Sequence, residues 1–114
     1  MPSATYGLFE RAMRERRPLV CMYDGYARAV CPIILGHTGD AEKALTWQFG
    51  GSGSKGPVHG QWRCLELAKV TQAELIDGPW QSGDSHMTSQ SCVRDVDLDA
   101  NPDSPYSPKR RLKR

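Results

Sequence analysis

The dipeptide Asp24-Gly25 separates two stretches rich in β-forming residues, Leu19–Tyr23 and Tyr26–Leu35. Asp-Gly is the strongest short-range signal for a tight hairpin turn, because glycine accepts a positive φ angle. The chain is therefore expected to fold around an antiparallel hairpin. Pro32 has no amide donor, so it must lie at a bulge, an edge or a strand end, and a bend at this point suits a barrel.

Three further strands are expected after the hairpin. Residues Ala44–Phe49 alternate large apolar side chains with small or polar ones, which predicts that the large ones form a core face. These large side chains are Leu45, Trp47 and Phe49. Gln61–Leu67 and Ala73–Ile76 supply the fourth and fifth strands, with a tight corner at Ala68–Val70. The pattern predicts a mainly β fold, one small and strongly curved antiparallel sheet.

Two segments between these strands have the composition of loops. Gly36–Asp40 is expected to connect the second and third strands. Gly50–Pro57 is expected to be a flexible loop, because its glycine content makes regular structure costly in backbone entropy. It lacks the GxxxxGK[ST] arrangement of a phosphate-binding loop.

An amphipathic helix is expected before the sheet, over Thr5–Arg17. Its apolar residues recur at intervals of three and four and form one stripe, and Pro18 should end it. The remaining faces carry arginine and glutamate, which are most simply solvated charges, although the arginines could also contact phosphates.

The carboxyl-terminal part of the chain divides in two. Cys92–Asp99 alternates apolar and charged residues, which favours either an extra edge strand or a strand added to a partner subunit. From Asn101 onward, prolines and basic residues predict a disordered tail. The expected organisation is one domain over residues 1–99 and a basic tail over 100–114.

Charge and cysteine usage exclude several classes of protein. The net charge is +2, with acidic and basic blocks that nearly cancel near the end of the chain, so no overall nucleic-acid footprint is visible. The four cysteines are far apart and form no CxxC pair, so no metal site is expected. No secretory leader or membrane-spanning run is visible, so a cytoplasmic location and free thiols are expected.

No set of catalytic groups can be recognised. The histidines His37, His59 and His86 fall in expected loops, and no nucleophile can be paired with them from the sequence. The chain is therefore expected to be no enzyme and to need no cofactor.

The chain resembles the WYL domain, a module of bacterial transcription regulators, over about Ala12 to Ile76. Ala12–Arg17 is similar to the end of the family's leading helix, and Tyr23 to the tyrosine that closes its first strand. Arg28–Pro32 is similar to its "R-x-V-x-P" strand, and Leu67–Val70 to its "L-D-R-I" corner. The order and spacing of these motifs carry the resemblance.

Two positions depart from the family pattern. The Trp-Tyr-Leu signature falls at Lys43-Ala44-Leu45, which keeps only the leucine, and Ala68 replaces the family's aspartate. The chain would thus be a divergent member, and it lacks the helix-turn-helix to which such domains are attached.

The resemblance implies a five-stranded Sm-like barrel, similar to an SH3 barrel, with one associated helix. It also implies a binding surface built from basic and aromatic residues, which correspond here to Tyr23, Arg28, Arg63 and Lys69. Arginine grips phosphate or carboxylate with a fixed fork of donors. The alternative is that Tyr23 packs in the core and the three cations are ordinary solvated charges. Trp62 and Trp80 fit packing better than base stacking.

The function expected from the sequence is that of a non-catalytic regulatory module that senses a nucleotide-like anion or nucleic acid in transcriptional control. It would act with a separate regulator protein or as a homo-oligomer, away from membranes. The alternative is a barrel that mediates protein association without a small ligand, with Cys92–Asp99 in the interface.

Overall fold

The chain begins with one capped helix, as the sequence predicts. The computed structural model describes residues 3–53, 56–57, 60–80 and 92–99. Helix α1 spans Ala4–Glu15, and the Oγ of its N-cap, Ser3, accepts the backbone N–H of Tyr6 at 3.1 Å. Arg16 ends the helix in the left-handed region, with φ 54°, two residues before Pro18.

The predicted hairpin is confirmed. Strand β1 spans Leu19–Tyr23 and strand β2 spans Tyr26–Thr38. Asp24 and Gly25 both have positive φ, 53° and 80°, as a tight turn of this kind requires. Strand β2 extends three residues beyond the predicted Leu35, so most of the predicted loop Gly36–Asp40 is strand.

Pro32 lies inside β2, where the register against the next strand shifts between Pro32 and Ile34. The missing amide is thus accommodated at an irregularity, one of the placements expected for proline in a sheet.

The prediction of a flexible loop over Gly50–Pro57 is wrong for most of its residues. Strand β3 spans Ala41–Gly53, and the short strand β4, Gly56–Pro57, pairs with its end. Glycine is needed here because the strands approach closely: a Cβ on Gly51, which has φ +84°, would lie 2.2 Å from the carbonyl oxygen of Ala27.

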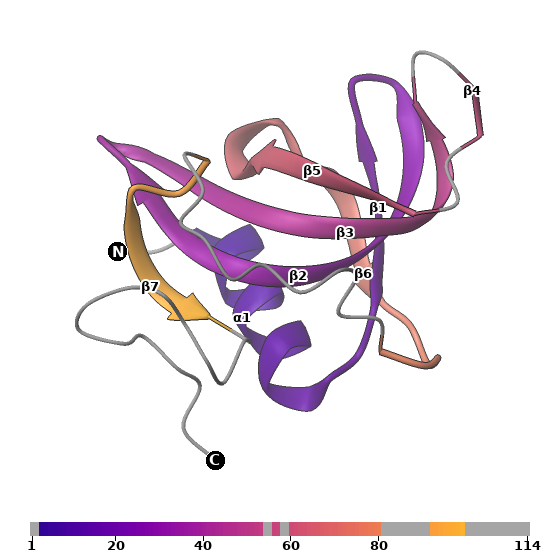
Figure 1. Cartoon of the computed structure of the whole chain (residues 1–114), viewed down its shortest axis with the longest axis horizontal. Coiled ribbons are helices and arrows are strands. Elements are labelled where there is room, and N and C mark those ends of the chain that lie inside the picture. The colour runs from indigo at the N-terminus through magenta and orange to yellow at the C-terminus, as the bar shows by residue number, and fades with distance from the viewer. Residues whose placement is uncertain (1–2, 54–55, 58–59, 81–91, 100–114) are drawn as a thin grey trace.

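The remaining strands complete one curled antiparallel sheet. Strand β5 spans Gln61–Glu66, a 3-10 turn covers Leu67–Lys69 at the predicted corner, β6 spans Thr71–Leu75, and β7 spans Asp95–Asp99. The order is β4-β3-β2-β1-β6, with β5 also on β3 and β7 also on β2. Figure 1 shows α1 against the curl of this sheet, with β7 and β4 at opposite ends of the β2–β3 pair.

The fold is mainly β with a single helix in the described part of the chain, as expected. The closed five-stranded barrel stays a prediction, because no ladder joins β5 to β6 among residues 60–80. The predicted tail, 100–114, lies outside the described residues.

The core face of β3 is the reverse of the predicted one. Its small and polar residues, Ala44, Thr46 and Gln48, are fully buried, whereas its large apolar residues are only half-buried. The inside of the curled sheet is already occupied by α1 and by apolar side chains of β1 and β2, so it leaves room for small side chains. The large side chains pack on the outside, and they are Leu45, Trp47 and Phe49.

Strand β7 covers the last five residues of the predicted strand Cys92–Asp99, and it pairs with β2 of its own chain. The hydroxyl of Tyr6 on α1 donates a hydrogen bond to the Asp97 carboxylate. His37 Nδ1 lies 3.2 Å from the same carboxylate, and its ring stacks on Tyr6. The first helix and the last described strand are therefore tied together.

The expectation of four thiols is wrong for two cysteines. Cys64 and Cys92 form a disulfide with a Cα–Cα distance of 5.7 Å. Cys64 is exposed, because it lies on the outer face of β5, opposite Leu45. Cys21 and Cys31 keep their thiols, as expected, and both are buried.

Candidate functional site

The guanidinium of Arg28 is buried inside the curl of the sheet, although arginine is rarely found there. Arg28 lies on β2 opposite Cys21, and only 6% of its surface is exposed. Its Nε donates to the backbone oxygen of Tyr23 at 3.3 Å, and its Nη1 donates to the side-chain oxygen of Gln48 at 3.1 Å. The hairpin and β3 together fix this cation in place.

Two tyrosine rings flank the Arg28 guanidinium. Its central carbon lies 5.2 Å from the ring centroid of Tyr23 and 5.9 Å from that of Tyr26. These two tyrosines pair across the hairpin at the turn, so their side chains are on the same face as Arg28. Both contacts are within the range of cation–π attraction, which partly replaces the lost hydration of the guanidinium.

The side-chain amide of Gln48 is held in one orientation. Its amide nitrogen donates to the backbone oxygens of Gly50 and Ser52 at 3.0 and 3.1 Å. This use of the nitrogen orients the amide oxygen toward Arg28. Both amide donors are occupied, so Gln48 positions Arg28 and has no N–H left to offer a ligand.

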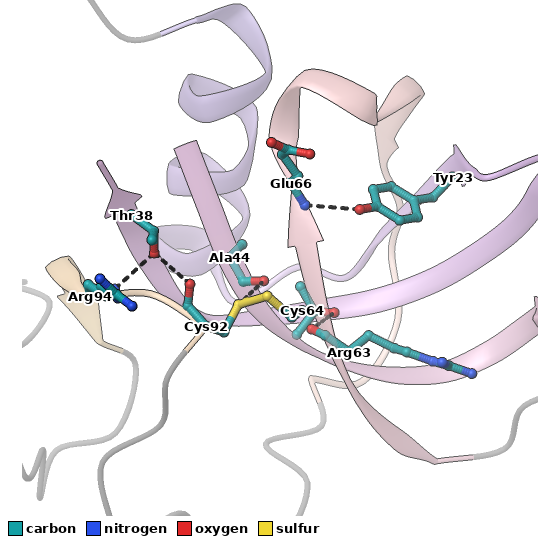
Figure 2. The surroundings of a disulfide bond; sticks show 9 residues. Tyr23, Thr38, Ala44, Arg63, Cys64, Glu66, Cys92 and Arg94 are labelled. Atoms are coloured by element: carbon teal, nitrogen blue, oxygen red, sulfur yellow. Dashed lines mark hydrogen bonds between the residues drawn. A yellow bond between two sulfur atoms is a disulfide. The ribbon is translucent and has the colours of Figure 1, made fainter. Parts of the chain in front are cut away.

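Tyr23 is anchored at its far end by β5. Its hydroxyl accepts the backbone N–H of Glu66 at 3.2 Å, as Figure 2 shows. The phenol ring is therefore held at both ends, by its own strand and by β5.

The charge of Arg28 has no acidic partner within the described residues. Its contacts there are a carbonyl, an amide oxygen and two rings. The neighbouring Cys21 does not supply a negative charge, because burial raises the pKa of its thiol to about 11 against the opposing effect of Arg28. A buried cation without a counter-charge is costly, which makes this position attractive for an anion.

Arg63 lies on the same face as Gln48. It pairs with Thr46, whose hydroxyl donates to the Arg63 backbone oxygen at 3.1 Å, and Thr46 is two residues from Gln48 on β3. The Nε of Arg63 is buried and has no hydrogen-bond partner in the described structure. In Figure 2 its side chain extends away from the disulfide.

Lys69 stands apart from this group. It is 63% exposed and its Nζ lies 3.4 Å from the carboxylate of Glu66, an ordinary surface ion pair. Of the four predicted site residues, the structure joins Tyr23 and Arg28, places Arg63 on the same face, and leaves Lys69 in solvent.

Sequence reasoning missed Gln48 and Tyr26. A glutamine in an alternating strand gives no local sign that it faces inward, and the tyrosine at a hairpin turn is a common surface residue. The only available signal was the pairing of Tyr26 with Tyr23 across the Asp24-Gly25 turn.

The other candidates have structural contacts. His37 binds Asp97, and the Trp62 ring meets Trp47 edge to face at 5.1 Å. Trp80 lies under the Arg16 guanidinium. His59 and His86 lie outside the described residues. Within residues 3–53, 56–57, 60–80 and 92–99, no three histidine, cysteine or acidic residues are arranged to hold a metal ion.

No family model, curated protein or solved structure matches this chain. None of the helices in the described ranges is long and apolar enough to cross a membrane.

Proposed function

We propose that this chain is a non-catalytic binding module that holds the anionic group of a nucleotide-like ligand or of nucleic acid at Arg28. One observation carries the proposal: Arg28 is a buried cation, held by Gln48 and two tyrosines, that lacks an acidic partner in the described part of the chain. A phosphate or carboxylate would supply that missing charge.

The donors of Arg28 fit such a ligand. Arginine has five N–H groups, and within the described residues the hydrogen bonds of Arg28 to Tyr23 and Gln48 use two of them. The remaining N–H groups of the guanidinium can bind an acceptor with two oxygens. The rings of Tyr23 and Tyr26 are held at the same place and offer flat surfaces to the base of a nucleotide.

We further propose that the module is a divergent WYL domain with an Sm-like barrel, acting in transcriptional control together with a separate regulator. This rests on the motif order in the sequence. A leading helix, a curled antiparallel sheet and a tight corner at Leu67–Lys69 are compatible with it.

A thermal-shift titration tests the binding proposal. Inorganic phosphate, AMP and a short oligonucleotide are each added to the full chain and to Arg28→Met, because a ligand that binds only the folded state raises the melting temperature. Arg63→Met asks whether the second arginine contributes, and Arg11→Ala, which removes a cation paired with Glu15 on the helix, is the control. Stabilisation of the parent and of Arg11→Ala, but not of a folded Arg28→Met, is expected. Equal stabilisation of all of them would refute the proposal.

A second candidate is protein association through the outer face of β3 and β5. The observation in its favour is that Trp47 and Trp62, together with Leu45 and Phe49, are only half-buried on that face. Salt separates the two candidates. Phosphate binding should weaken steeply as salt rises, whereas association through an apolar face should not.

A further inference from the structure

The disulfide joins β5 to the residues just before β7, and these two strands are not neighbours in the sheet. Cys64 is on β5, which pairs with β3, whereas Cys92 leads into β7, which pairs with β2. The bond closes a loop with a sequence separation of 28 residues. Figure 2 shows the bond beside the first part of β3, where the Sγ of Cys92 lies 3.6 Å from the Ala44 carbonyl oxygen.

Strand β7 is also held by its ladder with β2 and by the burial of Val96 and Asp99, and Val93, just before it, is buried in the core. The ladder with β2 involves only Ile34–His37. Thr38 Oγ1 donates to the Cys92 carbonyl at 2.8 Å and accepts the Arg94 N–H at 3.2 Å, and Asp97 contacts Tyr6 and His37. Apart from the disulfide, its covalent connection to β6 is the chain through residues 81–91. The bond therefore raises the effective concentration of β7 at its binding place.

The disulfide is open to a reductant. Cys64 is exposed and Cys92 is half-buried, and exposed disulfides are the more easily reduced and often regulatory ones. The other two thiols do not exchange with this disulfide. Cys21 and Cys31 are buried, and the raised pKa of Cys21 keeps its thiol protonated and therefore poorly nucleophilic.

We propose that the Cys64–Cys92 bond is a reducible latch on β7. A dithiol reductant attacks the bond through its thiolate, the S–S bond is converted into two thiols, and the dithiol is oxidised to its own disulfide. Strand β7 then separates from β2 and exposes the edge of β2 from Ile34 to His37. This inference is independent of the binding proposed at Arg28.

Hydrogen exchange of the full chain, with and without dithiothreitol, tests the latch. Mass spectrometry of the intact protein confirms reduction, and peptides covering β7 and the β1–β2 hairpin report protection. We expect the protection of Val96–Asp99 to fall by roughly 400-fold on reduction, the order expected when the disulfide that closes a loop of this length is broken. The amides of Leu19–Tyr23 should keep their protection.

The variant Cys64→Ser/Cys92→Ser serves as the matched control. It should show low β7 protection from the start and no response to dithiothreitol. Three results would overturn the proposal: a native bond that dithiothreitol does not reduce, a reduced protein in which β7 stays protected, or loss of protection in β1 and β2 together with β7. The last result would mean that the disulfide stabilises the whole fold and not β7 alone.

Discussion

The buried Arg28 guanidinium donates a hydrogen bond of 3.1 Å to the side-chain oxygen of Gln48, twenty residues further along the chain. The bond crosses from β2 to β3 inside the curl of the sheet, where both residues are buried. A hydrogen bond to a buried charge is expensive to lose, because the remaining partner keeps its desolvation cost.

Gln48→Ala is expected to destabilise the protein strongly. The change leaves Arg28 without its acceptor on β3 and removes the bonds to Gly50 and Ser52, so the free energy of unfolding should fall by about 2–4 kcal/mol. Urea unfolding followed by circular dichroism measures this. Gln61, which faces Gln48 on β5 but is exposed, is the control, and its alanine variant should change stability by less than about 0.5 kcal/mol. Similar losses for both variants would contradict the role given to Gln48.

Gly51→Ala should be far more costly than the same change at Gly39. Both positions have positive φ, +84° and +62°, so both pay a backbone strain of about 1–2 kcal/mol. Only Gly51 meets an obstacle, the Ala27 carbonyl oxygen at 2.2 Å from the new Cβ, whereas Gly39 faces open space. An additional loss of about 1–3 kcal/mol is expected at Gly51. Equal denaturation midpoints for the two variants would show that the β2–β3 approach is not as close as described.

Stability should decline in alkaline solution through Tyr6. Burial, followed by the hydrogen bond to Asp97, raises the pKa of Tyr6 above its usual value. Because the unfolded chain then loses the phenol proton first, the stabilisation is complete below the unfolded pKa of about 10 and is lost as the pH rises above it.

Tyr6→Phe isolates this effect from the other titrating groups, which include Cys21. The variant should be less stable at pH 8, because Asp97 loses a donor, and the difference from the parent should shrink between about pH 10 and 11.5. Urea midpoints across this pH range give the answer. A constant difference between the two proteins would be inconsistent with a raised tyrosine pKa.

Thiol labelling should divide the four cysteines into two pairs. After reduction of the folded protein at pH 8, iodoacetamide should modify Cys64 and Cys92 quickly, since they are not deeply buried. Cys21 should react slowly, because burial raises its pKa to about 11, and Cys31 is fully buried. Mass spectrometry should count two labels in buffer and all four in urea. Four rapid labels in buffer would argue against the described core.

The sequence predicted those elements whose signals are local. The helix, the Asp24-Gly25 hairpin, the corner at Leu67–Lys69 and the edge strand each depend on residues close in the chain, and the structure contains all four. The predictions that are wrong concern features that depend on contacts between distant segments. Which face of β3 points inward depends on what else fills the curl, and the glycines at its end serve a close approach to β2.

The residues of the candidate site likewise divide into those with a local sequence signal and those without one. Tyr23 and Arg28 could be named because they lie close together in the sequence and resemble a known motif. Gln48 could not, because its role depends on the β2–β3 register. The Cys64–Cys92 pairing depends on two strands that meet only in the folded chain, which the spacing of cysteines does not reveal.

The most direct test of the central claim is the side-chain Nε–Hε resonance of Arg28 in an NMR titration. The resonance is assigned by its disappearance in Arg28→Lys, and AMP or inorganic phosphate is added to the labelled parent. The account predicts a saturable shift of the Arg28 signal while that of Arg11 on the helix stays in place. An unmoved Arg28 signal at saturating ligand, or equal shifts of both arginines, would contradict it.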